Sequence, residues 1–349
     1  MRILINTPRL IPQGGVANHY LGLWNYWTEH VIYNPIGKKG NKIGSGIYRL
    51  PINILTFIRK ILFFHPDVVL LNPSLSKSAV VRDMLFLKVA KCFNKKVVVF
   101  FHGFDKNCIP TLNIPSLVKD LNKCECIFLL ANEFKEILRS WGVKTPMYLT
   151  TTKVDDELVK DFDISCRAGK IETILFLARI TEEKGIFIAL KAFKICTVSH
   201  PNLKMRVVGD GPALENAKKM CEIENIQNVI FLGALSGEKL TSEYKKAELY
   251  LFPTYHAEGM PTSVLEAMAF GLPVVTRSVG GLSDFFENGK MGNMTDSLSP
   301  QDFANAVIPY IEDAQLTRTV SLHNYNYALS HFMASMVAKN IERELIKII

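Results

Sequence analysis

The most informative stretch of the sequence is EGMPTSVLEAMAFGLPVV, which covers residues 258–275. It follows the apolar run 249–252, which is typical of a buried strand. Pro261 suits the first position of a helix, where its missing amide hydrogen costs nothing, while Gly271 and Pro273 indicate where that helix ends. The stretch therefore predicts a strand, a loop and a helix that begins at the carboxyl end of a strand, where α/β sheets bind ligands.

The start of this helix offers the backbone amides of Met260, Thr262 and Ser263 to a ligand. Free amides and the helix dipole favour phosphate or hydroxyl oxygens. Glu266 lies among apolar neighbours, and its two carboxylate oxygens match the two vicinal hydroxyls of a ribose. The alternatives are a helix-start Glu that gains about 0.3–1 kcal/mol from the dipole, and an exposed turn for Glu258.

Short apolar runs alternate with amphipathic stretches on both sides of residues 258–275. Near-continuous runs such as 68–71 and 97–101 are typical of parallel strands covered on both faces. The polar segment 153–170 predicts a linker. We predict strands at 2–6, 67–72, 96–101, 125–130, 147–150, 173–178, 204–209, 228–232, 249–252 and 273–276, and helices at 15–29, 76–93, 115–122, 133–141, 185–197, 212–222, 237–246, 261–270, 300–312, 315–329 and 332–348.

This order of elements predicts an α/β protein with two Rossmann-like doubly wound domains, over residues 1–160 and 161–330. A chain of 349 residues with 48% hydrophobic residues can bury two such cores. The net charge of +8 suits an anionic partner, although an ordinary basic enzyme would carry it equally well. Because no basic motif has interleaved aromatic residues, we expect no nucleic-acid partner.

The seven irregularly spaced cysteines are typical of reduced thiols in the cytoplasm, and residues 1–6 run into a strand without a signal segment. Charged residues and a proline interrupt the apolar run 52–71, so it is too broken to span a membrane. Residues 54, 57, 58, 61 and 62 follow helical spacing beside Arg59 and Lys60. This pattern allows a helix at a membrane surface, but it favours a helix packed on its own sheet.

Two cations follow the predicted strand 173–178. Arg179 lies at its carboxyl end, and Lys184 precedes the next helix. Together they would clamp a diphosphate and stabilise it as a leaving group. The alternative is a pair of surface charges that neutralise Glu182 and Glu183.

Glycines mark two further ligand positions. Gly209 and Gly211 follow a strand, but Leu214 replaces the third glycine of a dinucleotide motif, which weakens a dehydrogenase interpretation. Gly14 and Gly15 precede the first helix and would allow close approach to a phosphate or sugar.

His102 ends a buried strand and could donate to a substrate hydroxyl, although a structural role is the commoner one for such a histidine. The sequence has no nucleophile elbow, P-loop lysine, His-Glu-x-x-His motif or paired-cysteine zinc motif. Hydrolases, P-loop NTPases and zinc peptidases are thereby disfavoured.

Glu258 and Glu266, separated by seven residues and followed by AMAFGLPV, resemble the E-x7-E signature of the retaining group 1 glycosyltransferases with the GT-B fold. Several other segments follow the order of that family: Arg179 with Lys184, residues 209–212, residues 231–233, Gly14 with Gly15, and His102 with Gly103. The resemblance is close in the C-terminal half and weak in the N-terminal half. It implies two Rossmann-like domains that face a cleft, with the last helix, residues 330–349, crossing back to the first domain.

The resemblance also implies residue roles. An N-terminal domain would bind the acceptor and a C-terminal domain the nucleotide-sugar, a co-substrate linked to UDP or GDP. Arg179 and Lys184 would hold the diphosphate, Glu266 the ribose, and Glu258 with the backbone of residues 259–262 the transferred sugar. Leu235 would lie near the base, Gly14 and Gly15 under the phosphate, and His102 at the sugar. Gly209 would also contact the nucleotide-sugar. The backbone contacts to the transferred sugar would come from Gly259, Met260, Pro261 and Thr262.

The implied reaction moves a hexose from the donor to a glycan or lipid-linked glycan, by front-face substitution and without a cofactor. Since no Asp-x-Asp follows a strand, we expect metal-independent activity. A basic cytoplasmic enzyme fits bacterial O-antigen or capsule synthesis at the inner membrane face, with peripheral contact to anionic lipid. The alternatives are a nucleotide-sugar 2-epimerase and a non-catalytic nucleotide-sugar-binding subunit.

Overall fold

The computed structural model describes residues 1–10, 15–36, 45–104 and 106–349. These residues fold into two compact units. Unit 1 comprises Met1–Lys153, Ala257–Met260 and Ala334–Ile349, and unit 2 comprises Val154–His256 and Pro261–Met333. Within the described ranges, no helix is both long and apolar enough to cross a membrane.

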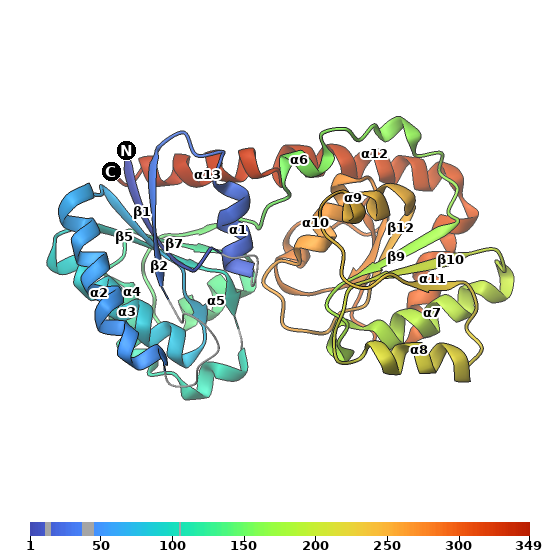
Figure 1. The fold of residues 1–349 in the computed structure, drawn as a ribbon, viewed down its shortest axis with the longest axis horizontal. Helices are drawn as coiled ribbons and strands as arrows, with labels where there is room; N and C mark the ends of the chain where they lie inside the picture. Colours follow the sequence, from blue (N-terminus) through green and yellow to red (C-terminus); the bar gives the residue numbers. More distant parts are fainter. Residues whose placement is uncertain (11–14, 37–44, 105) are drawn as a thin grey trace. The chain divides into compact units, whose positions relative to one another are not determined.

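Unit 1 is built on a six-stranded parallel sheet in the order β2-β1-β3-β5-β7-β8 (Figure 1). The runs 68–71 and 97–101 are wholly buried, as expected for central strands. The sheet strands are β1 (Arg2–Pro8), β2 (His30–Ile36), β3 (Val68–Leu71), β5 (Lys96–Phe101), β7 (Cys126–Leu129) and β8 (Met147–Leu149), and β4 (Ser74–Leu75) pairs with β6 (Gly103–Phe104).

Helices flank this sheet. On one side α2 contacts α3, which contacts α4, and elsewhere in the unit α1 contacts α13. The helices are α1 (Gly15–Leu23), α2 (Ser45–Phe64), α3 (Lys77–Cys92), η1 (Lys106–Thr111), α4 (Ile114–Leu121), α5 (Asn132–Ser140) and α13 (Ala334–Ile346). The prediction of one helix over 15–29 was too long, because α1 ends at Leu23 and the chain turns into β2, an edge strand that the sequence analysis missed.

The last helix belongs to unit 1, as the fold prediction required. The carboxylate of Glu342, only 3% exposed, anchors it. Glu342 Oε1 accepts hydrogen bonds from the amides of Thr28 and Glu29, both at 2.8 Å, and Oε2 accepts one from Thr28 Oγ1 at 2.6 Å. These bonds compensate the burial of the carboxylate.

Unit 2 has a second six-stranded parallel sheet in the order β11-β10-β9-β12-β13-β14. Its strands are β9 (Thr173–Leu177), β10 (Lys204–Val208), β11 (Val229–Phe231), β12 (Leu249–Phe252), β13 (Val274–Arg277) and β14 (Gly292–Thr295). The sequence analysis missed β14, whose residues GNMT lack an apolar pattern. The segment predicted as a linker begins with a bridge between Val154 and Met333 and contains α6 (Asp156–Val159) and η2 (Ile164–Cys166).

Helices accompany this sheet: α7 contacts α8 and α11, and α12 contacts both α10 and α11 (Figure 1). The helices are η3 (Glu182–Lys184), α7 (Ile186–Ser199), α8 (Leu214–Ile223), α9 (Gly237–Lys246), α10 (Thr262–Ala269), η4 (Gly280–Asp284), α11 (Pro300–Glu312) and α12 (Ala314–His331). Both units are thus doubly wound parallel sheets, as predicted.

Candidate active site

The strand order of unit 2 identifies where a ligand would bind. From β9 the chain builds outward to β10 and β11 and then returns to place β12 on the other side of β9. Ligands of doubly wound sheets bind at such a switch point, outside the carboxyl ends of the strands. Arg179 follows β9 by two residues, and the loop 253–261 follows β12, so both candidate segments flank the switch point.

Backbone hydrogen bonds fasten together the loops that follow β9, β10 and β11. The amide of Ile180 donates to the carbonyl of Asp210 at 2.9 Å, and the amide of Gly209 donates to the carbonyl of Gly233 at 2.8 Å. Gly209 has a φ of 136°, and a Cβ there would lie 1.8 Å from the carbonyl oxygen of Ala178. Only glycine fits this close approach, so Gly209 fixes the edge of the sheet on which the exposed Arg179 lies.

Lys184 is tied to the loop that follows β12. The carbonyl of Glu183, its neighbour in η3, accepts hydrogen bonds from the amides of Tyr255 at 2.8 Å and His256 at 3.0 Å. Lys184 Nζ lies 5.9 Å from the ring centroid of Phe252. The Glu183 carboxylate lies 3.9 Å from His256 Nδ1, a pairing that the sequence analysis did not consider. The half-buried Leu235 lies beyond β11, before α9.

The helix within residues 258–275 begins one residue later than predicted. Pro261 is the N-cap, with an extended backbone (φ −71°, ψ 107°), and α10 starts at Thr262. The first backbone bond runs from the amide of Val264 to the carbonyl of Pro261 at 3.1 Å. The amides of Thr262 and Ser263 precede that bond, as a helix-terminal anion site requires.

Glu266 is held by a tyrosine that the sequence analysis missed. The hydroxyl of Tyr244, on α9, donates to Glu266 Oε2 at 2.7 Å. Its ring stacks on Phe270 with centroids 5.1 Å apart and planes 5° from parallel. Burial, and then the charge of Glu266, raise the pKa of Tyr244 well above its usual value, so the phenol remains protonated and can donate. Tyr250 similarly bonds Ser263 Oγ at 2.8 Å.

Arg167 joins the two helices that carry this pair. Its guanidinium donates to the carbonyl of Tyr244 at 2.9 Å, near the end of α9, and to the carbonyl of Phe270 at 3.0 Å, at the end of α10. It also donates to the carbonyl of Ala247. A cation at two helix carboxyl ends is favourable because both ends carry partial negative charge. Arg167 therefore holds in place the ends of the two helices that carry Tyr244 and Glu266.

Glu258, the first glutamate of residues 258–275, has a different environment. Residues Ala257–Met260 group with unit 1. A Cβ at Gly259 would lie 2.7 Å from the carbonyl oxygen of His102, so glycine is required for this contact. Thr152 Oγ1 donates to the carbonyl of Met260 at 3.4 Å. The segment that carries Glu258 is thus packed beside His102.

His102 belongs to a polar cluster at the carboxyl edge of the unit 1 sheet. Asn72 Nδ2 donates to the carbonyl of Asn6 at 2.9 Å, so Asn72 Oδ1 is an acceptor. His102 Nε2 lies 3.0 Å from Asn72 Oδ1, and the hydroxyl of Tyr20 donates to the same oxygen at 2.5 Å. His102 Nε2 therefore carries the hydrogen, and Nδ1 is an acceptor. The sequence suggested that His102 donates to a substrate hydroxyl. With this tautomer, Nδ1 of His102 can only accept a hydrogen bond from such a hydroxyl.

His19 lies against His102, with ring centroids 4.9 Å apart. It is 3% exposed, and among the described residues neither ring nitrogen has a hydrogen-bond partner. Burial, and then the charge of Lys153, lower the pKa of His19 to about 3. Burial, and then His19, lower the pKa of His102 well below its usual value. Both imidazoles are therefore neutral at pH 7.

The structure thus collects the predicted residues into two sets. Unit 2 contains Arg179, Lys184, Gly209, Leu235, Pro261, Thr262 and Glu266, and unit 1 contains His102, Glu258, Gly259 and Met260. Gly15 is the first residue of α1, whereas Gly14 lies outside the described residues. Among the described residues, no group of three His, Cys, Asp or Glu side chains is arranged to hold a metal ion.

Sequence reasoning missed several supporting residues, chiefly Tyr244, Arg167, Asn72 and His19. Tyr244 gave a weak signal, since it is the one aromatic residue in the polar stretch 237–246. The others gave none, because their partners are distant in sequence: the carbonyl of Phe270 is 103 residues from Arg167.

Comparison with known proteins finds a family model that matches just under half of the chain. Residues 160–326 match the family model described as glycosyl transferases group 1. Over 170 residues the chain is 28% identical to a 2-deoxystreptamine N-acetyl-D-glucosaminyltransferase of Niallia circulans, covering 48% of this chain and 43% of that protein. Over 172 residues it is 26% identical to the capsular polysaccharide biosynthesis glycosyltransferase CapM of Staphylococcus aureus, covering 48% and 44%. The matches thus span less than half of either relative.

Among solved structures, Anabaena Alr3699/HepE in complex with UDP is similar over 99% of this chain and 100% of that one. The TM-score is 0.78 and the sequence identity is 17%. This similarity confirms the GT-B fold that the sequence resemblance implied.

The buried His19 predicts a pH-dependent stability of unit 1. The unfolded chain binds a proton at His19 below about pH 6.5, whereas the folded chain does so only near pH 3. Protons therefore favour unfolding between these values. Between pH 7 and pH 5, the parent should lose about 2 kcal/mol of unfolding free energy more than a His19→Phe variant does.

Urea unfolding followed by tryptophan fluorescence measures this difference, because the three tryptophans, Trp24, Trp27 and Trp141, all lie in unit 1. Equal losses in both proteins would show that His19 does not titrate as proposed.

Proposed function

We propose that this chain, whose residues 160–326 match the family model described as glycosyl transferases group 1, transfers a sugar from a nucleotide-sugar donor with retention of anomeric configuration. The acceptor is a glycan or a lipid-linked glycan. The observation that supports the proposal is the switch point of unit 2: Arg179 and Lys184 follow β9, α10 follows the adjacent strand β12, and Tyr244 holds the carboxylate of Glu266 on α10.

In this proposal the donor diphosphate is bound by Arg179 and Lys184. The amides of Thr262 and Ser263 add donors at the start of α10. A nucleoside diphosphate carries charge that a guanidinium and an ammonium neutralise, and that charge increases as the sugar departs. The complex of Anabaena Alr3699/HepE with UDP supports UDP as the first donor nucleotide to test, and GDP is the second.

Glu266 binds the ribose in this proposal. Tyr244 occupies Oε2, which fixes the orientation of the carboxylate toward two vicinal hydroxyls. Leu235 lies against the base. Tyr244 is a positioning residue, because it acts through Glu266, while Arg167 holds the ends of both helices in place.

The transferred sugar is held by Glu258 and the backbone of residues 259–262. His102, as a neutral imidazole, accepts a hydrogen bond from a sugar hydroxyl at Nδ1, because Nε2 donates to Asn72. The packing of Gly259 against the carbonyl of His102 keeps these two contributors together. Gly15, the first residue of α1, lies under the phosphate in this assignment.

The reaction is a front-face substitution. The acceptor hydroxyl attacks the anomeric carbon from the face that the nucleotide leaves, through an oxocarbenium-like state. The new carbon–oxygen bond forms as the bond to the diphosphate oxygen breaks, and that departing oxygen takes the hydroxyl proton. Arg179 and Lys184 stabilise the charge of the leaving diphosphate, so no separate base is required.

The acceptor belongs to bacterial surface polysaccharide synthesis in this proposal, at the inner face of the cytoplasmic membrane. The similarity to the capsular polysaccharide glycosyltransferase CapM supports this assignment. An O-antigen or capsule subunit on a lipid carrier is the acceptor class. The sugar transferred is a hexose.

A nucleotide screen tests the donor assignment. The parent is heated with UDP, GDP, ADP and their sugars, beside Arg179→Ala, Glu266→Gln and Tyr244→Phe. One nucleotide class should stabilise the parent, by about 2.7 kcal/mol at a hundredfold excess over its dissociation constant. The shift should vanish in Arg179→Ala and Glu266→Gln and shrink in Tyr244→Phe, which keeps the carboxylate but frees its orientation.

Lys191→Ala is the matched control for charge, because Lys191 is exposed on α7 and lies outside both sets of site residues. It should bind as the parent does. Equal stabilisation of the parent and Glu266→Gln by the same nucleotide would remove Glu266 from the donor site.

Chelation tests the assignment of charge stabilisation to Arg179 and Lys184. With the donor identified by the screen, transfer should proceed at the full rate in excess EDTA, because the two side chains supply the positive charge. Loss of transfer that manganese restores would overturn the metal-independent mechanism.

A further inference from the structure

Helix α2 of unit 1 has two apolar faces, only one of which is buried. Phe57 and Ile61 are at most 1% exposed, which confirms that the helix packs on its own unit. On the other side, Ile52, Leu55, Leu62 and Phe63 are 61%, 66%, 50% and 77% exposed. With 3.6 residues per turn, these four positions fall within an arc of about 100°.

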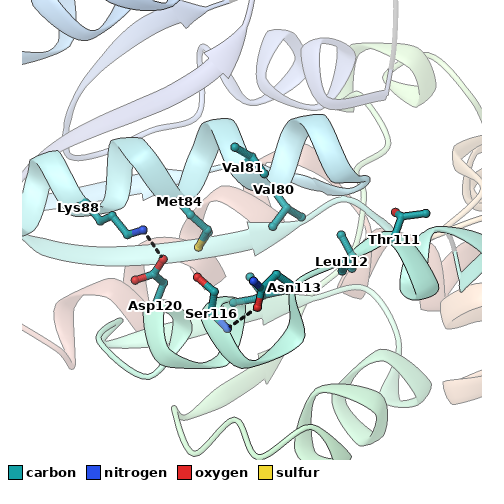
Figure 2. A pocket seen from close by; sticks show the side chains of 10 residues that line it. Val80, Val81, Met84, Lys88, Thr111, Leu112, Asn113, Ser116 and Asp120 are labelled. Atoms are coloured by element: carbon teal, nitrogen blue, oxygen red, sulfur yellow. Dashed lines mark hydrogen bonds and ion pairs between the residues drawn. The ribbon is translucent and has the colours of Figure 1, made fainter.

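Helix α3 also exposes apolar side chains. Val81 and Leu85 of α3, which contacts α2, are 67% and 36% exposed. Val81 also lines a groove of about 500 Å³ between α3, η1 and α4, beside Met84 and Leu112 (Figure 2). Groups of exposed large apolar side chains mark interaction sites on soluble proteins.

The charges of this surface are positive. Arg59 lies within the exposed arc of α2, with its guanidinium carbon 5.6 Å from the ring centroid of Phe63. Helices α2, α3 and α4 contain two acidic residues, and both are buried in ion pairs: Asp83 with Arg82 at 2.6 Å, and Asp120 with Lys88 at 3.0 Å (Figure 2). Helix α2 itself contains Arg49, Arg59 and Lys60 and no Asp or Glu.

Positive charge is also unevenly distributed between the two parts of the chain. Residues 1–153 contain 21 Lys and Arg against 8 Asp and Glu, a net charge of +13. Residues 154–349 contain 20 against 25, a net charge of −5. The excess positive charge therefore lies in the unit that carries the exposed apolar helix.

We propose that α2 and the outward side of α3 form a membrane-docking surface that binds an anionic lipid bilayer. The apolar side chains enter the region between headgroups and acyl chains, and the surrounding cations contact lipid phosphates. A bilayer satisfies both observations at once, since it offers apolar depth beneath an anionic surface. A second copy of the same surface would instead bring like charges together. The surface does not depend on the donor chemistry.

Vesicle flotation tests this surface on the full chain. The parent should float with vesicles that contain 30% phosphatidylglycerol in phosphatidylcholine, and at least tenfold less with phosphatidylcholine alone. The variant Leu55→Gln/Leu62→Gln/Phe63→Gln should bind the anionic vesicles at least tenfold more weakly. Arg59→Gln should weaken binding by a smaller factor that high salt abolishes.

The matched control is Val198→Gln/Ile223→Gln/Leu298→Gln, which removes three apolar side chains of unit 2 that are 83%, 84% and 51% exposed. It should float as the parent does. Thermal unfolding and nucleotide binding of the α2 variant should match the parent, which separates a failure of docking from a failure of the donor assignment. No flotation of the parent, equal flotation of both triple variants, or a dimer that only the α2 variant loses would overturn the proposal.

Discussion

The carbonyl oxygen of Ala178 lies where a side chain at residue 209 would begin, and the candidate donor site depends on this contact. Because Gly209 has no Cβ, the turn after β10 can pack on the end of β9, and flanking backbone bonds fix the turn after β11 to the same edge. Parallel strands end together at one edge of a sheet, but their loops need not lie in fixed positions. Here backbone contacts set the positions of the loops after β9, β10 and β11, and Arg179 lies in the first of these loops.

Much of this organisation could be predicted from the sequence. The alternation of apolar runs and helices predicted two doubly wound sheets, and residues 258–275 with the preceding apolar run predicted the strand, the loop and the helix that carries Glu266. Of the four edge strands, β8 and β11 were predicted, whereas β2 and β14 escaped prediction, because β2 contains a proline and β14 has no apolar periodicity. The first turn of α10 was misplaced by one residue, because Pro261 takes an extended backbone as the N-cap.

The supporting residues of the site could not be predicted for a different reason. A carboxylate such as Glu266 is visible in a motif, but its orientation comes from Tyr244, which another helix supplies. Likewise, His102 is visible in the sequence at the end of a strand, whereas its tautomer follows from Asn72, which is 30 residues away. Such partners are set by tertiary packing, so the spacing of residues in the sequence does not identify them. The exposed face of α2 is a similar case, because periodicity alone could not tell which apolar residues point inward.

The central claim is that Glu266 reads the ribose of a nucleoside diphosphate while cations hold the phosphates. Titration calorimetry with the nucleoside diphosphate that binds, UDP or GDP, and with its 2′,3′-dideoxy analogue tests it most directly. The parent should lose at least tenfold in affinity for the analogue, and Glu266→Gln should bind both compounds equally weakly. An equal loss for the analogue in both proteins would contradict the account, because the ribose hydroxyls would then be recognised elsewhere.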